Sequence, residues 1–110
     1  MSERSSGRSW GYDPRAGAEL VEEIEYLCAE DREIAAALEV EVTHAIEQLL
    51  EHPEIGVVVR KRGGLCFRKW PLQRFRYSLI YALVGEELRI YALAHHRREP
   101  GYWLSRLRAG

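Results

Sequence analysis

The chain has 110 residues, of which 46% are hydrophobic and 30% are charged. This length fits one domain with a modest core, and this balance excludes a disordered chain. No apolar run approaches the roughly 18 residues of a membrane-spanning helix, the N-terminus lacks the apolar segment of a secretory signal, and the two cysteines form no zinc or disulfide motif. We expect a cytoplasmic protein with a flexible tail over residues 1–7 and a single domain over residues 8–110.

The net charge of −1 conceals a strong asymmetry between the two halves of the chain. Residues 1–55 carry 4 Lys or Arg and 14 Asp or Glu, whereas residues 56–110 carry 12 Lys or Arg and 3 Asp or Glu. The first half therefore has a net charge of −10 and the second half of +9. A basic half of this kind favours a polyanion or an acidic protein as partner. The alternative is that the two halves neutralise each other across the fold.

A short strand and a helix are predicted at the start of the domain. Trp10 and Tyr12 lie two residues apart within positions 8–13, as expected of a strand. Asp13 and Pro14 then suit the N-cap and the first position of a helix. The apolar face of this helix consists of Leu20, Ile24 and Leu27. The carboxylates that we expect to be solvated are Glu19, Glu22, Glu23 and Glu25.

A second helix is predicted from Asp31, a further N-cap, to His52-Pro53, because proline disfavours a helical residue before it. Its apolar residues recur at steps of three and four: Ile34, Leu38, Val42, Ala45, Ile46 and Leu49. The two helices are therefore expected to form an acidic antiparallel hairpin with a shared apolar seam.

The period changes from helical to alternating after residue 56. Strands are predicted over residues 57–62, 65–72, 77–84 and 88–94. Gly63-Gly64 indicates a two-residue hairpin turn, and residues 77–84 are apolar on both faces, as in a central strand. A polar loop over residues 95–101 precedes a short terminal helix over residues 102–107.

This order predicts an α+β fold: an N-terminal strand, a two-helix hairpin, a twisted and mainly antiparallel sheet of four to five strands, and a short C-terminal helix. The helices are expected to pack on one face of the sheet. We expect the core to include Leu20, Ile24, Leu27, Leu38, Val42, Ile46, Leu49, Leu79, Tyr81, Ile90 and Leu93.

Two stretches of the second half carry a family resemblance. Residues 68–81 read R-K-W-P-L-Q-R-F-R-Y-S-L-I-Y, and residues 92–103 read A-L-A-H-H-R-R-E-P-G-Y-W. Together with the strand and helical hairpin that lead into His52-Pro53-Glu54, they resemble the RelE/ParE superfamily of type II toxin–antitoxin toxins. The resemblance extends from about Arg8 to Arg106.

The resemblance implies a small α+β toxin that is inhibited by a co-encoded antitoxin and needs no cofactor. It also implies growth inhibition, which we expect to occur by ribosome-dependent mRNA cleavage. The alternatives are a ParE-like, non-enzymatic poison of DNA gyrase and an inactive regulatory partner that only binds its antitoxin. Whether the protein is an enzyme therefore stays open at this stage.

RNA cleavage by the 2′-hydroxyl needs a base, an acid for the leaving oxygen and cations around the phosphorane. The residues that could supply these groups are His95, His96, Arg97 and Tyr102. Alternation along the preceding strand sends the two histidines to opposite faces, so that one of them is expected to have a packing or capping role. No Cys, Asp or further His stands at metal-ligand spacing beside them, and no metal site is expected.

The residues that we expect to bind the target are Arg68, Lys69, Arg74, Arg76, Arg98 and Trp103. The first four fall within nine residues, which favours a basic patch facing a ligand over a solvated strand face. Arg97 and Arg98 could instead pair with the acidic helices, and Trp103 could stack on a base.

Departures from the nuclease members weigh against cleavage. Ser78 stands where those members carry an arginine, their lysine pair is not reproduced, and Trp103 lies where some have a catalytic tyrosine. Arg97 matches the arginine that ends their last strand. The stretch over residues 68–81 resembles the ParE-like members more.

Overall fold

The computed structural model describes residues 8–108, so the tail predicted over residues 1–7 lies outside the described part. In chain order the elements are β1 (Ser9–Tyr12), α1 (Pro14–Glu30), α2 (Arg32–Glu51), β2 (Val57–Arg62), β3 (Leu65–Pro71), β4 (Tyr77–Val84), β5 (Glu87–His95) and the 3₁₀ turn η1 (Leu104–Arg106). No helix within residues 8–108 is long and apolar enough to cross a membrane.

The helix boundaries lie where the capping residues predict them. The Asp13 carboxylate accepts the Arg15 N–H at 2.8 Å and α1 begins at Pro14. Asp31 ends α1 and caps α2, accepting the Glu33 N–H at 2.9 Å. The second helix ends before Pro53, as predicted. Short polar side chains therefore satisfy N–H groups that the first turn of each helix leaves unpaired.

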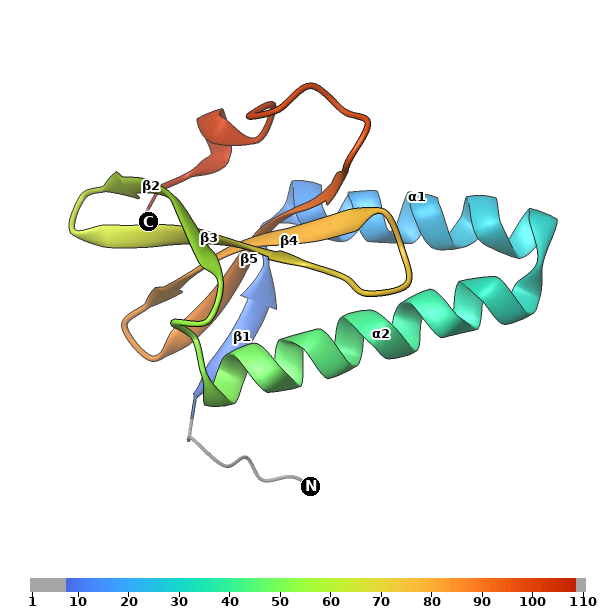
Figure 1. The fold of residues 1–110 in the computed structure, drawn as a ribbon, viewed down its shortest axis with the longest axis horizontal. Coiled ribbons are helices and arrows are strands. Elements are labelled where there is room, and N and C mark those ends of the chain that lie inside the picture. Colours follow the sequence, from blue (N-terminus) through green and yellow to red (C-terminus); the bar gives the residue numbers. More distant parts are fainter. Residues whose placement is uncertain (1–7, 109–110) are drawn as a thin grey trace.

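The five strands form one sheet in the order β1-β5-β4-β3-β2 (Figure 1). The first strand runs parallel to β5, and the other neighbours are antiparallel. The hydrophobic strand β4 is central, as its two apolar faces predict. Gly63 and Gly64 turn the β2–β3 hairpin with φ values of 59° and 79°, which glycine adopts without strain.

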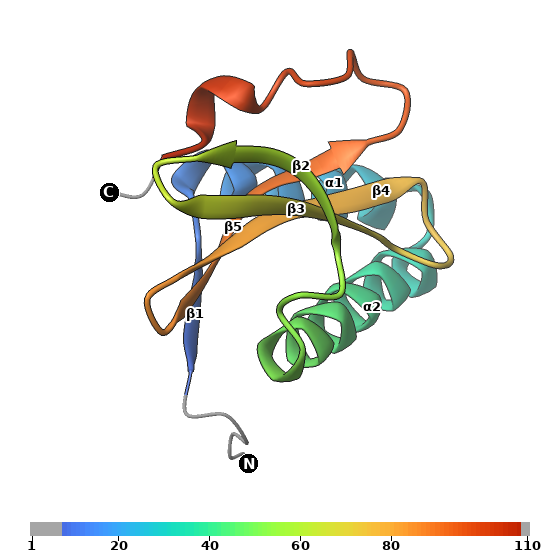
Figure 2. The same ribbon diagram turned by 60° about the vertical axis from the view of Figure 1, so that its left-hand side comes forward.

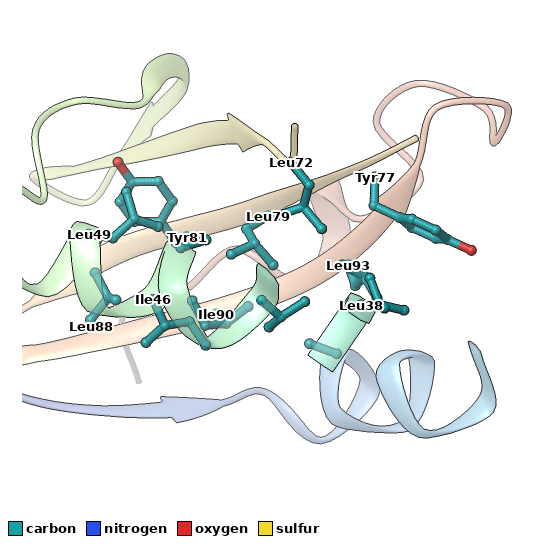
Figure 3. Close-up of a cluster of buried hydrophobic side chains, with 13 residues drawn as sticks. Leu38, Ile46, Leu49, Leu72, Tyr77, Leu79, Tyr81, Leu88, Ile90 and Leu93 are labelled. Carbon is teal, nitrogen blue, oxygen red and sulfur yellow. The ribbon is translucent and has the colours of Figure 1, made fainter. Parts of the chain in front are cut away.

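Both helices pack on one face of the sheet, where the larger core cluster lies (Figure 3). The buried residues predicted for it are confirmed: Leu38, Val42, Ile46, Leu49, Leu79, Tyr81, Ile90 and Leu93. Leu20, Ile24 and Leu27, which were also predicted, pack against this cluster but are only half-buried. The hairpin of α1 and α2 extends beyond the sheet (Figure 1), and several apolar residues of these helices are exposed: Val21, Tyr26 and Ile34.

The opposite face of the sheet, here called the open face, carries a second apolar cluster. The C-terminal segment, residues 96–108, runs along this side of the molecule (Figure 2). Trp103 and Leu107 are buried there against Phe67, Ile80 and Ala92. The predicted terminal helix is reduced to the single 3₁₀ turn η1.

Candidate functional site

Two grooves flank the point where the chain leaves β5. The open-face groove has a volume of about 420 Å³, and its polar lining includes Arg60, Lys69, Ser78, His96, Arg98 and Glu99. The helix-side groove has a volume of about 490 Å³, and its polar lining includes Glu19, Glu22, Glu23, Tyr26, Tyr77, Arg97 and Arg98. His95 and Tyr102 line both grooves. The predicted site residues are thus divided between two chemical environments.

The two histidines lie on opposite sides of the sheet, as alternation predicts. The His96 Nε2 atom lies 3.0 Å from the Ser78 hydroxyl in the open-face groove. The His95 ring stands edge-on to Tyr77, with ring centroids 4.9 Å apart, and its Nδ1 accepts the Arg97 N–H at 2.9 Å. His95 therefore packs on Tyr77 and accepts the Arg97 N–H, whereas the imidazole of His96 contacts Ser78.

The Tyr102 hydroxyl is engaged in a structural hydrogen bond. It donates to Glu19 Oε2 at 2.8 Å, and the Arg98 guanidinium lies 3.7 Å from its ring centroid. Burial and the Glu19 carboxylate raise the pKa of Tyr102 to about 12. A phenol with this pKa and this partner does not exchange protons readily near neutral pH.

Glu19 is a hub that joins α1, β5 and the C-terminal segment. Besides the hydrogen bond from Tyr102, its carboxylate accepts hydrogen bonds from both terminal nitrogens of Arg106, at 3.1 and 3.0 Å. It also accepts one from the Leu93 N–H at 3.1 Å. The first strand pairs with β5 only as far as Ile90, so the Leu93 N–H has no strand partner on that side. The prediction that Glu19 is solvated is wrong, because this carboxylate completes the edge of β5.

Arg97 is exposed and faces an acidic wall. The helix-side groove that it lines also contains Glu22 and Glu23 of α1. Burial and the nearby Glu23 carboxylate raise the pKa of Tyr77 in the same groove. Carboxylates in this position repel phosphate, so the groove that holds Arg97 is a poor place for a nucleic-acid backbone.

The basic patch predicted over residues 68–76 is divided by the fold. Arg68 lies beside Tyr81 in the register and donates to the Glu54 and Gly56 carbonyls at 2.9 and 2.8 Å. Arg74 and Arg76 are exposed in the loop between β3 and β4, where the Glu41 carboxylate accepts the Arg74 N–H. Of the four, only Lys69 lines the open-face groove.

Trp103 is 9% exposed, packs in the open-face cluster and also lines the open-face groove. The sequence did not predict the roles of three polar residues at these grooves. These are Arg60 in the lining of the open-face groove, Ser78 as the partner of His96, and Glu19 as the shared acceptor for several groups. A lone serine in the apolar strand over residues 77–84 was the one signal that could have identified Ser78. Within the described residues, no group of three or more His, Cys, Asp or Glu side chains could hold a metal ion.

Comparison with known proteins places this geometry in a family. Residues 12–100 match the family model described as the ParE toxin of the type II toxin–antitoxin system, parDE. The chain belongs to the ParE toxin family. A solved structure titled "Chromosomal ParDE TA system from P. aeruginosa" has a TM-score of 0.66 at 18% sequence identity, covering 83% of this chain and 98% of that chain. This similarity supports the fold alone, and no curated protein matches the chain significantly.

Proposed function

We propose that this member of the ParE family acts as a non-enzymatic poison of DNA gyrase and is held inactive by a cognate antitoxin. The observation that carries the proposal is that three of the four candidate catalytic residues are engaged in contacts within the fold. His96 lies in the open-face groove, His95 packs on Tyr77, and the Tyr102 hydroxyl is bound to Glu19. Arg97, the fourth, faces the carboxylates of α1. A toxin that works by binding needs no such group to exchange protons.

Exposed cations supply the proposed target-binding surface. Arg74, Arg76 and Arg97 are exposed, and within residues 8–108 none of their side chains forms an ion pair with a carboxylate. Charged groups of this kind determine association rate and specificity in protein complexes. Replacing Arg97 with Ala should weaken growth arrest. Acidic segments of the antitoxin are expected to compete for the same cations.

Ribosome-dependent mRNA cleavage is the second candidate. The observation in its favour is that the open-face groove combines an imidazole, His96, with the cations Lys69 and Arg60. These groups stabilise phosphate charge in many nucleases. His95 also lines this groove, but its ring packs on Tyr77 and its Nδ1 atom accepts the Arg97 N–H, so the second imidazole is already engaged.

Induction of the chain alone in a bacterial host separates the two candidates. Labelled thymidine and labelled amino acids are pulsed within minutes, and mRNA 5′ ends are mapped in the same cells. Early loss of DNA synthesis, with filamentation and intact mRNA, is the expected result. Rapid loss of protein synthesis with new cuts inside translated codons would overturn the proposal in favour of cleavage. Normal growth with soluble protein present would leave only the regulatory role.

A further inference from the structure

Ser78 is a buried polar side chain near the start of the apolar central strand β4. It is 1% exposed and is the one buried polar or charged residue among residues 8–108. Its hydroxyl meets His96 Nε2 at 3.0 Å across the end of β5. A hydroxyl buried without a partner is destabilising, so this contact fixes the orientation of the imidazole. When Ser78 donates to Nε2, the ring proton of His96 resides on Nδ1, which is then free to donate.

Three cations line the same groove, and two of them come from strands. Lys69 lies in β3, where it is paired with Ile80 of β4. Arg60 lies in the edge strand β2. Neither side chain forms an ion pair or a hydrogen bond within residues 8–108. Arg98 stands at the other wall, although it also lies 3.8 Å from Glu19. Glu99 is the single carboxylate in the lining, so the groove carries a positive excess.

The geometry points to a phosphate-binding site in the open-face groove, in which Ser78 positions His96 and Lys69 and Arg60 supply the charge. The ligand class is a phosphate ester, from a free nucleotide or from a nucleic-acid backbone. A volume of about 420 Å³ exceeds the needs of a lone phosphate and leaves room for part of an attached nucleoside beside Ile80 and Ala94. This inference does not depend on whether the toxin acts on gyrase or on the ribosome.

The test is titration of the isotope-labelled full-length chain, made by cell-free synthesis and followed by NMR. The probes are inorganic phosphate, adenosine 5′-monophosphate and a 5′-phosphorylated tetradeoxynucleotide. Each supporting probe shifts the His96 ring signals together with the Ser78 and Lys69 amides. A response to the monophosphate alone assigns a free nucleotide, and a response to the oligonucleotide alone assigns a nucleic-acid backbone. If none of the probes moves these signals, the inference is wrong.

Charge variants show whether the binding is local. Lys69→Ala and Arg60→Ala should each weaken binding about tenfold, which corresponds to one charge-assisted hydrogen bond. Lys61→Ala is the matched control, because Lys61 follows Arg60 directly in β2 but does not line the groove. It should leave the affinity within about twofold. Equal weakening by all three variants would reduce the site to general surface charge and overturn the inference.

Ser78→Ala tests the positioning of His96. Loss of the hydroxyl should change the ¹⁵N shift of His96 Nε2 and weaken phosphate binding, and Ser78→Thr should restore both. A role confined to packing would lower the melting temperature without moving the imidazole signal, and this outcome would contradict the positioning of His96. If neither serine variant folds, His96→Gln is the alternative test, because His96 is exposed and its replacement leaves Ser78 in place. This variant should weaken phosphate binding in the same titration.

Discussion

At the scale of single residues, one hydroxyl holds the connection between the helices and the sheet. The fully buried Tyr81 donates to the Pro53 carbonyl at 2.8 Å and accepts the Gly56 N–H at 2.9 Å. Gly56 must be glycine here, because a Cβ at this position would lie 2.5 Å from the Tyr81 hydroxyl oxygen. The Arg68 guanidinium also holds the loop between α2 and β2, by donating hydrogen bonds to the Glu54 and Gly56 carbonyls.

Removing that hydroxyl should destabilise the protein without changing its fold. In Tyr81→Phe the Gly56 N–H and the Pro53 carbonyl lose their partner in a buried site. We expect the free energy of unfolding to fall by about 1–3 kcal/mol, measured by urea denaturation. Tyr26→Phe is the control, since Tyr26 is 64% exposed. Equal stability of the two variants would show that the buried bonds do not stabilise the fold.

The N-cap of α1 should make stability depend on pH in the acid range. Burial alone would raise the pKa of Asp13, but the hydrogen bonds and charge of Arg15 hold it below the ordinary value of 3.8. The ionised carboxylate therefore stabilises the fold above about pH 4, and this stabilisation is lost as the pH falls through the folded pKa.

Asp13→Asn isolates this charge, because Asn caps helices about as well as Asp. The variant should be less stable by about 0.3–1 kcal/mol at pH 7, and the difference should shrink as the pH falls below about 4 and through the folded pKa of Asp13. Thermal unfolding across this range measures it. A difference that stays constant with pH would contradict the role of the charge.

The sequence predicts the caps and the opposite faces of the histidines, since both follow from local geometry. It could not identify the contacts of Arg68, because these depend on where β3 meets the loop after α2. The sequence also does not predict a β-bulge in β5. Ile80 pairs with Ala92 whereas Tyr81 pairs with Ile90, so Tyr91 is an extra residue that changes which side chains of β5 share a face. Register of this kind is a tertiary property.

At the scale of elements, the C-terminal segment is fastened to the sheet through Glu19. The Arg106 side chain is only 11% exposed, and its charge is compensated by Glu19 at 3.0 Å. Arg106 also donates to the Tyr91 carbonyl at 3.1 Å. The edge of β5 beyond β1 is thereby covered by side chains of α1 and of the C-terminal segment rather than by a strand.

Glu19→Ala should therefore be among the most destabilising single changes in α1. It leaves a nearly buried guanidinium and the Leu93 N–H without their partner, for which we expect a loss of about 3–5 kcal/mol. Glu22→Ala, at an exposed position of the same helix, should stay within about 0.5 kcal/mol of the parent. Urea denaturation compares the two. A small effect of Glu19→Ala would mean that water satisfies the Arg106 guanidinium and the Leu93 N–H in place of the carboxylate.

The strands and their order along the chain were predictable, because alternation and the glycine turns mark them. The half-burial of Leu20, Ile24 and Leu27 was not, because periodicity gives the apolar face of a helix but not the extent of the layer that it meets. The hub at Glu19 was missed for a related reason. Helical periodicity assigns a carboxylate to the polar side and does not show that a later segment returns to cover it.

At the scale of the molecule, the charge asymmetry of the sequence becomes a spatial one. The acidic half forms β1 and both helices, and the basic half forms the other four strands and the C-terminal segment. The helices carry the negative charge on one side of the sheet, while β2 and the open face carry cations such as Arg60 and Lys69. An acidic antitoxin or a DNA-bound target is therefore expected to approach the basic side, at a rate that falls with ionic strength.

The histidines separate the two modes of action in a cell. In the double variant His95→Gln/His96→Gln, each side chain keeps a hydrogen-bonding end but cannot carry a proton near neutral pH. Because the proposed poison transfers no proton, we expect growth arrest on induction to persist, within about twofold of the parent in surviving colonies. Full recovery of growth, with the variant folded and expressed, would indicate acid–base chemistry.

The most direct measurement is supercoiling of relaxed plasmid by purified bacterial DNA gyrase in the presence of the purified chain, with DNA breaks scored in the same reactions. We expect the chain to inhibit supercoiling and to trap gyrase-bound DNA breaks, and we expect His95→Gln/His96→Gln to do so equally. Unimpaired gyrase, together with cutting of mRNA when the same preparation is added to translating ribosomes, would contradict the proposed gyrase poisoning.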